Sequence, residues 1–113
     1  MNLAKNETRA INDLKERLIA LCPGQIKSIT LFGSKARGEE SPFADIDLLV
    51  VVTKESLELW DKIQSVSSEV SLDRDVLLSI KVMDSDHLSY LEKVESGFIK
   101  NVYKDGASIW KAA

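Results

Sequence analysis

The stretch DIDLLVVVT, from residue 45 to residue 53, constrains the fold of this chain more than any other segment. Two aspartates open it, and every residue from Leu48 to Val52 is apolar. A short aliphatic and β-branched run predicts a strand, and apolar residues at both alternating positions predict that both of its faces are covered. The chain must therefore supply packing layers on two sides of a central strand.

Other periodic segments supply these layers. In the first of them, apolar residues recur every three or four positions, which predicts a helix that ends at Pro23-Gly24. The predicted helices cover residues 3–21, 55–71 and 85–96, with a helical continuation over 98–103. The predicted strands cover residues 26–32, 45–53 and 75–83; residues 35–42 form a loop, and residues 108–111 a tail that pairs with a sheet edge or packs through Trp110. We expect one α/β (α+β) domain over residues 1–113, with a small mixed sheet of three to four strands and helices packed on it.

Composition narrows the functional classes. The 113 residues carry 15 basic and 18 acidic side chains, a net charge of −3, whereas nonspecific nucleic-acid binders usually carry a basic excess. The one cysteine, Cys22, cannot form an internal disulfide, which suits a reducing compartment, so we expect a cytoplasmic protein. No apolar run approaches the ~20 residues that span a bilayer, and we expect no membrane association.

Asp45 and Asp47 are the first candidate site residues. Residues two apart in a strand point to the same side, so these two carboxylates repel each other at the start of an apolar strand. A divalent cation would offset the repulsion, because hard cations prefer oxygen ligands. Metal ions held in this way activate nucleophiles and stabilise leaving oxygens in phosphoryl chemistry.

A second group of candidates follows the first strand. Gly33 lets the backbone approach a ligand closely, and the amides after it, with the Ser34 hydroxyl, can donate to phosphate oxygens. Arg37 lies one turn further on and can contact a phosphate with two hydrogen bonds. We expect Lys35 to be solvated. Together with the aspartate pair, these residues predict a site for a metal-bound nucleoside triphosphate.

The predicted topology brings these groups together. The end of the first strand and the start of the second must meet at one edge, so those strands are expected to be antiparallel neighbours. The helix over 55–71 is long enough for a right-handed crossover that makes the second and third strands parallel. The start of the third strand then lies near the aspartate pair. Asp75 is the candidate third carboxylate there, and Asp73 is the alternative.

Two strings carry a family resemblance: LFGSKARG at residues 31–38 and ADIDL at 44–48. The spacing of Gly-Ser, ten residues and then Asp-x-Asp resembles the signature of the DNA polymerase beta-like nucleotidyltransferases, and the full strings resemble their minimal bacterial and archaeal members. The resemblance covers nearly the whole chain and implies the palm-like nucleotidyltransferase fold. Many minimal members are similar to antitoxins encoded beside an all-helical HEPN-type toxin, and some adenylylate a tyrosine of that partner.

The resemblance also implies roles for individual residues. Gly33 and Ser34 would hold the triphosphate, and Asp45 and Asp47 would bind Mg²⁺. The third acidic position, which maps best onto Asp75, would be a further metal ligand and the general base. Such enzymes transfer a nucleoside monophosphate from a triphosphate to a hydroxyl and release pyrophosphate.

These observations support one main hypothesis and several rivals. The main hypothesis is a Mg²⁺-dependent nucleotidyltransferase that moves AMP from ATP, or another nucleoside monophosphate, to a hydroxyl of a helical HEPN-type partner, as the antitoxin of a pair. The alternative is an antitoxin with little or no catalysis that neutralises the partner by forming a complex. Under either hypothesis the protein can form a homo- or hetero-oligomer. Transfer to a small molecule such as an aminoglycoside needs a second domain, and template-directed polymerisation is disfavoured because there is no basic groove for a duplex.

Overall fold

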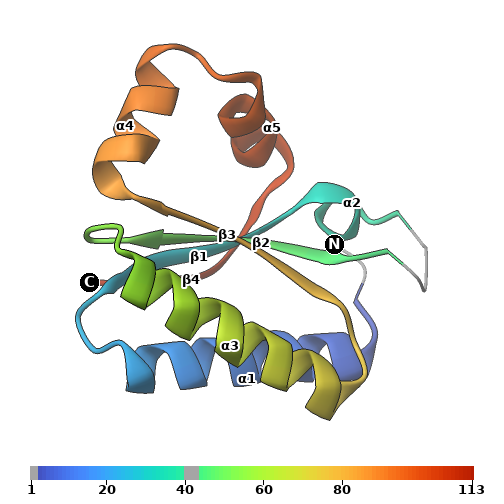
Figure 1. Ribbon diagram of the computed structural model, residues 1–113. Coiled ribbons are helices and arrows are strands. Elements are labelled where there is room, and N and C mark those ends of the chain that lie inside the picture. Colours follow the sequence, from blue (N-terminus) through green and yellow to red (C-terminus); the bar gives the residue numbers. More distant parts are fainter. Residues whose placement is uncertain (1–2, 40–43) are drawn as a thin grey trace.

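A four-stranded sheet of strand order β3-β2-β1-β4 forms the centre of the computed structural model, which describes residues 3–39 and 44–113 (Figure 1). The strands are β1 (Ile26–Phe32), β2 (Ile46–Val52), β3 (Leu78–Asp84) and β4 (Ala107–Lys111). β1 pairs antiparallel with β2 and with β4, whereas β2 pairs parallel with β3. The expected mixed sheet is therefore confirmed, and the tail forms its fourth strand. Lys35 and Ala36 of the predicted loop belong to the short helix α2 (Gly33–Ala36), and residues 40–42 of that loop lie outside the described residues.

Helices cover both faces of this sheet. In Figure 1, α1 (Lys5–Leu21) and α3 (Leu57–Arg74) lie below it, α4 (Ser85–Lys93) and α5 (Gly97–Asp105) lie above it, and the short α2 (Gly33–Ala36) follows β1 at one end. The continuous helical stretch predicted from residue 85 to residue 103 is wrong in one respect: it is broken at Glu95, whose φ of 54° is left-handed. None of the helices in the described part of the chain has the length and hydropathy of a membrane span.

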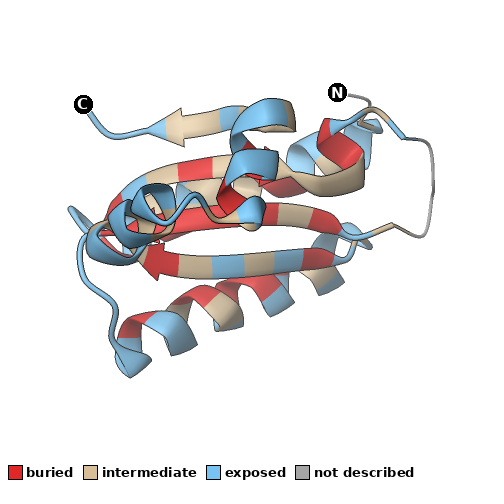
Figure 2. Cartoon of the chain, turned by 90° about the horizontal axis from the view of Figure 1, so that it is seen from above, coloured by how far each residue is buried: buried red, intermediate tan, exposed pale blue. Residues whose placement is uncertain are grey.

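β2 is buried from both sides, as its sequence predicts. Each residue from Leu48 to Val52 has an exposed fraction of 4% or less, and Figure 2 shows the buried positions along the inner strands. Leu48 and Val50 join the core cluster on the side of α1 and α3. Leu49 and Val51 join a second cluster on the side of α4 and α5. The two clusters hold β2 between the layers and so fix the position of the aspartates at its start.

β3 begins at Leu78 rather than at Asp75, where the sequence places it. Helix α3 continues to Arg74 and ends at Asp75, which has a left-handed φ of 53° and donates its backbone N–H to the Ser71 carbonyl. The Ser71 hydroxyl in turn accepts a hydrogen bond from the Leu78 amide at 3.2 Å. Asp75 is therefore the cap of a helix and not the first residue of a strand.

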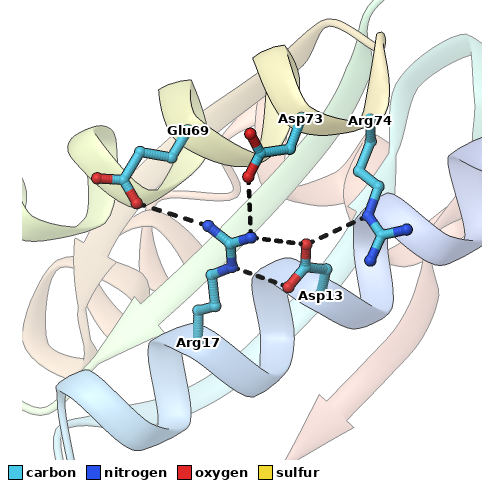
Figure 3. A network of polar contacts seen from close by, with 5 residues as sticks. All are labelled: Asp13, Arg17, Glu69, Asp73 and Arg74. Carbon is cyan, nitrogen blue, oxygen red and sulfur yellow. Dashed lines mark hydrogen bonds and ion pairs between the residues drawn. The ribbon is translucent and has the colours of Figure 1, made fainter.

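An ion-pair network fastens α1 to the end of α3 (Figure 3). Arg17 Nε contacts Asp13 Oδ1 at 2.8 Å, and the same guanidinium reaches Asp73 Oδ2 at 3.1 Å and Glu69 Oε2 at 3.5 Å. Arg74 Nε contacts Asp13 Oδ2 at 3.3 Å. Burial raises the pKa of Asp13, but hydrogen bonds from Arg17 and Arg74 outweigh burial and bring the pKa below its ordinary value.

Replacing Asp13 with asparagine should lower the free energy of unfolding by about 1 kcal/mol at neutral pH, because the side chain keeps its size but loses its charge. The folded pKa of Asp13 lies below its unfolded value. Its contribution is therefore complete above about pH 4 and is lost as the pH falls through the folded pKa. Urea unfolding of both proteins at neutral pH and near pH 3 measures this. A stability difference that stays the same at both pH values would contradict the charge-based explanation.

Candidate active site

Gly33 lies where β1 ends and α2 begins, directly against Asp47 of β2. Phe32 pairs with Asp47 in the antiparallel register, so the next residue of the turn reaches the carboxylate. Gly33 has a φ of 74°, a left-handed conformation that favours glycine. A Cβ atom at this position would also collide with Oδ2 of Asp47. The structure therefore brings the Gly33-Ser34 turn and one carboxylate of the pair together.

The two aspartates differ in their surroundings. Asp45 immediately precedes β2 and is exposed, whereas Asp47 is partly buried. Burial raises the pKa of Asp47 above its ordinary value, the charge of Asp45 raises it further, and Arg37 partly opposes these effects. The ionised pair is thus electrostatically unfavourable in the protein alone. This is the condition that a bound cation relieves.

Arg37, directly after α2, interacts electrostatically with Asp47 of this pair. It caps the helix and is exposed, and its Nε contacts Glu39 Oε1 at 3.2 Å. The hydrogen bond to Glu39 is the largest cause that raises the pKa of Arg37, and the charges of Asp105 and Asp47 add to it. The guanidinium is thus placed among carboxylates at the open side of the turn, where a phosphate could compete for it.

The prediction that Lys35 is solvated is wrong. Its exposed fraction is 4%, and its Nζ contacts Glu7 Oε2 at 2.8 Å. Burial raises the pKa of Glu7, but hydrogen bonds from Lys35 and from the Ala4 amide outweigh it and lower the pKa overall. The ion pair ties the start of α1 to α2, and so to the glycine turn. Sequence reasoning missed this role because Glu7 and Lys35 belong to elements that meet only in the folded chain.

The structure does not bring the predicted third carboxylate to the pair. Asp75 is exposed at the end of α3 and lines a cavity of about 500 Å³, together with Lys35 and Ala44. The alternative, Asp73, faces away and contacts Arg17. Across residues 3–39 and 44–113, no group of three or more His, Cys, Asp or Glu side chains is arranged to hold a metal ion.

The chain was compared with known protein families, and the match agrees with a site made of a glycine turn and an Asp-x-Asp strand. The family described as "Polymerase beta, Nucleotidyltransferase" matches residues 15–113. The chain belongs to the polymerase beta nucleotidyltransferase family. A Methanocaldococcus jannaschii relative, named "Putative protein adenylyltransferase", is 30% identical over 105 residues, which are 93% of this chain and 99% of the relative. The chain is therefore an enzyme of the nucleotidyltransferase class, as its sequence motifs predict.

Solved structures of nucleotidyltransferases share the fold. The structure of the spectinomycin adenyltransferase from Enterococcus faecialis with ATP and spectinomycin superposes with a TM-score of 0.67 at 16% identity, over 94% of this chain and 56% of that one. A structure described as tri-AMPylated Shewanella oneidensis HEPN toxin in complex with MNT antitoxin gives a TM-score of 0.53 at 17% identity, over 93% of this chain and 72% of the matched one. At these identities the likeness establishes the nucleotidyltransferase fold.

Proposed function

We propose that this nucleotidyltransferase transfers AMP from ATP to a hydroxyl group of a helical HEPN-type partner and acts as the antitoxin of that partner. The contact of Gly33 with Asp47 is the observation that carries the proposal, because it joins a phosphate-binding turn to a metal-binding carboxylate. Two comparisons support the choice of acceptor. The archaeal relative carries a protein adenylyltransferase name, and one fold neighbour is an antitoxin in complex with an AMPylated HEPN toxin.

In this proposal the residues of the site divide into two groups. The amides of Gly33 and Ser34 open helix α2, where backbone N–H groups have no partner within the helix, and they donate to phosphate oxygens. Arg37 exchanges part of its contact with Glu39 for the triphosphate. Asp45 and Asp47 bind Mg²⁺, and their mutual repulsion fits this role. When bound, Mg²⁺ supplies charge neutralisation of the phosphates and of the leaving pyrophosphate.

The transfer itself is a displacement at the α-phosphorus. The acceptor hydroxyl oxygen forms a bond to this phosphorus, and the bond to the bridging oxygen breaks, so that pyrophosphate leaves with that electron pair. The hydroxyl proton passes to a general base. That Asp75 is this base and a third metal ligand stays a prediction. Its position at the end of α3 does not by itself support either role.

Label transfer tests the proposal. The protein is mixed with the protein encoded next to it, Mg²⁺ and α-labelled ATP, and label on that partner is followed on a gel. We expect label on the partner with the wild type and none with the Asp45→Asn, Asp47→Asn double variant. Label that persists with the double variant contradicts the catalytic assignment. A tight complex without any label supports the alternative, an antitoxin that acts by complex formation. A parallel reaction with an aminoglycoside in place of the partner is the control, and label on the aminoglycoside but not on the partner contradicts the proposed acceptor.

A further inference from the structure

Ser79 of β3 occupies the position beside Asp47 on the neighbouring strand. β2 and β3 are parallel, and their register pairs Asp47 with Ser79, about 4.8 Å apart across the sheet. The flanking residues Leu78 and Ile80 pack into the cluster on the side of α1 and α3. Ser79 therefore lies on the opposite face, like Lys81, whose ammonium lies 5.1 Å from the centre of the Phe98 ring of α5.

Asp47 lies on this same face. Leu49, two residues further along β2, belongs to the cluster beneath α4 and α5. Asp47 and Ser79 are consequently side-by-side neighbours at the end of the sheet where Gly33 packs. A carboxylate that joined the aspartate pair from β3 would have to stand at position 79. The chain has an exposed hydroxyl there instead.

The other carboxylates near β3 do not lie on the strand beside Asp47. Asp84, at the far end of the strand, accepts hydrogen bonds from the amides of His87 and Glu55. Asp75 ends α3, three residues before the strand begins, and borders the cavity that Glu7 and Lys35 also line. β3 itself thus brings no carboxylate to the pair.

We infer that this site binds a single divalent ion together with the nucleotide, through Asp45 and Asp47, and that Ser79 is the residue that limits it to one. The inference rests on the proposed nucleotide site and specifies its metal content. A divalent ion at a nucleotide is usually held by one or two carboxylates together with the phosphates. The aspartate pair supplies these ligands for one ion, and Ser79 supplies no further carboxylate for a second. Replacing Ser79 with aspartate supplies that carboxylate on an exposed position of an edge strand.

Counting Mn²⁺ ions tests this inference without any turnover. Each protein is dialysed against Mn²⁺ and a nonhydrolysable ATP analogue, and bound Mn²⁺ per chain is measured by electron paramagnetic resonance. We expect one ion per chain for the wild type, for Asp75→Asn and for the matched neutral control Ser79→Asn. For Ser79→Asp we expect one additional ion. Thermal unfolding of each variant verifies that it is folded.

Three results would overturn the inference: two ions in the wild type, loss of an ion in Asp75→Asn, or no additional ion in folded Ser79→Asp. If Ser79→Asp does not fold, the numbers of Mn²⁺ ions bound by the wild type and by Asp75→Asn still test whether the site holds a single ion. Absence of protein-bound Mn²⁺ and nucleotide from the wild type is a different outcome, since it contradicts the proposed nucleotide site itself. The two claims therefore fail in distinguishable ways.

Discussion

Asp47→Asn should reduce nucleotidyl transfer by about a hundredfold or more while the protein stays as stable as the wild type or becomes slightly more stable. The loss of activity is expected because the neutral amide is a poor metal ligand and no longer offsets charge at the reacting phosphates. The unchanged or higher stability is expected because the pKa of Asp47 is raised by burial and by Asp45. The charged form of this carboxylate is unfavourable in the folded chain, and asparagine removes that cost.

Rates of label transfer and urea unfolding at neutral pH measure the two effects. Asp61→Asn is the matched control, because Asp61 is an exposed carboxylate on α3 and has no place in the candidate site. It should leave both quantities unchanged. A marked fall in stability of Asp47→Asn would mean that the carboxylate serves the fold. Full activity in that variant would remove Asp47 from the site.

Gly33→Ala should abolish transfer because the methyl group takes the space of the Asp47 carboxylate. Two costs act at once. The left-handed backbone of Gly33 is unfavourable for alanine by about 1 kcal/mol, and the collision with Oδ2 of Asp47 displaces that carboxylate. The turn can no longer present its amides beside the metal-binding carboxylate. Loss of transfer should therefore accompany a loss of stability.

Gly24→Ala is the control that measures the cost of the left-handed backbone without a collision. Gly24 has a φ of 73°, close to that of Gly33, but a Cβ there meets nothing within 4 Å. It should lose about 1 kcal/mol of stability from backbone strain alone and keep full transfer activity. Thermal unfolding and label transfer on both variants give the comparison. Equal activity of the two alanine variants would show that the approach of Gly33 to Asp47 is not needed for the reaction.

The sheet was largely predictable from the sequence because its central strand has an unmistakable pattern. The apolar residues of β2 require two covering layers, and chain order then leaves few topologies. The antiparallel pairing with β1 and the parallel pairing with β3 both follow from connection lengths and are confirmed. The close approach of Gly33 to Asp47 follows from the same topology. These features depend on local pattern and on strand order alone.

The third carboxylate could not be placed in this way, because its position depends on where α3 stops. The apolar residues after Asp75 place it at the start of β3, but α3 extends to Arg74 and is held there by contacts with α1. A helix end set by long-range ion pairs leaves no local signal. The buried pair of Lys35 with Glu7 escaped prediction for the same reason. The place of Ser79 beside Asp47 depends on the register between β2 and β3, which the sequence pattern does not specify.

The central claim is that one site joins the Gly33-Ser34 turn to the aspartate pair around a metal-bound triphosphate. A crystal structure with Mn²⁺ and a nonhydrolysable ATP analogue tests it most directly, because the anomalous signal of Mn²⁺ locates the metal independently. We predict Mn²⁺ bound to Asp45 and Asp47, with the phosphates against the amides of Gly33 and Ser34. Mn²⁺ bound away from Asp45 and Asp47, or phosphates bound away from the amides of Gly33 and Ser34, would contradict the account.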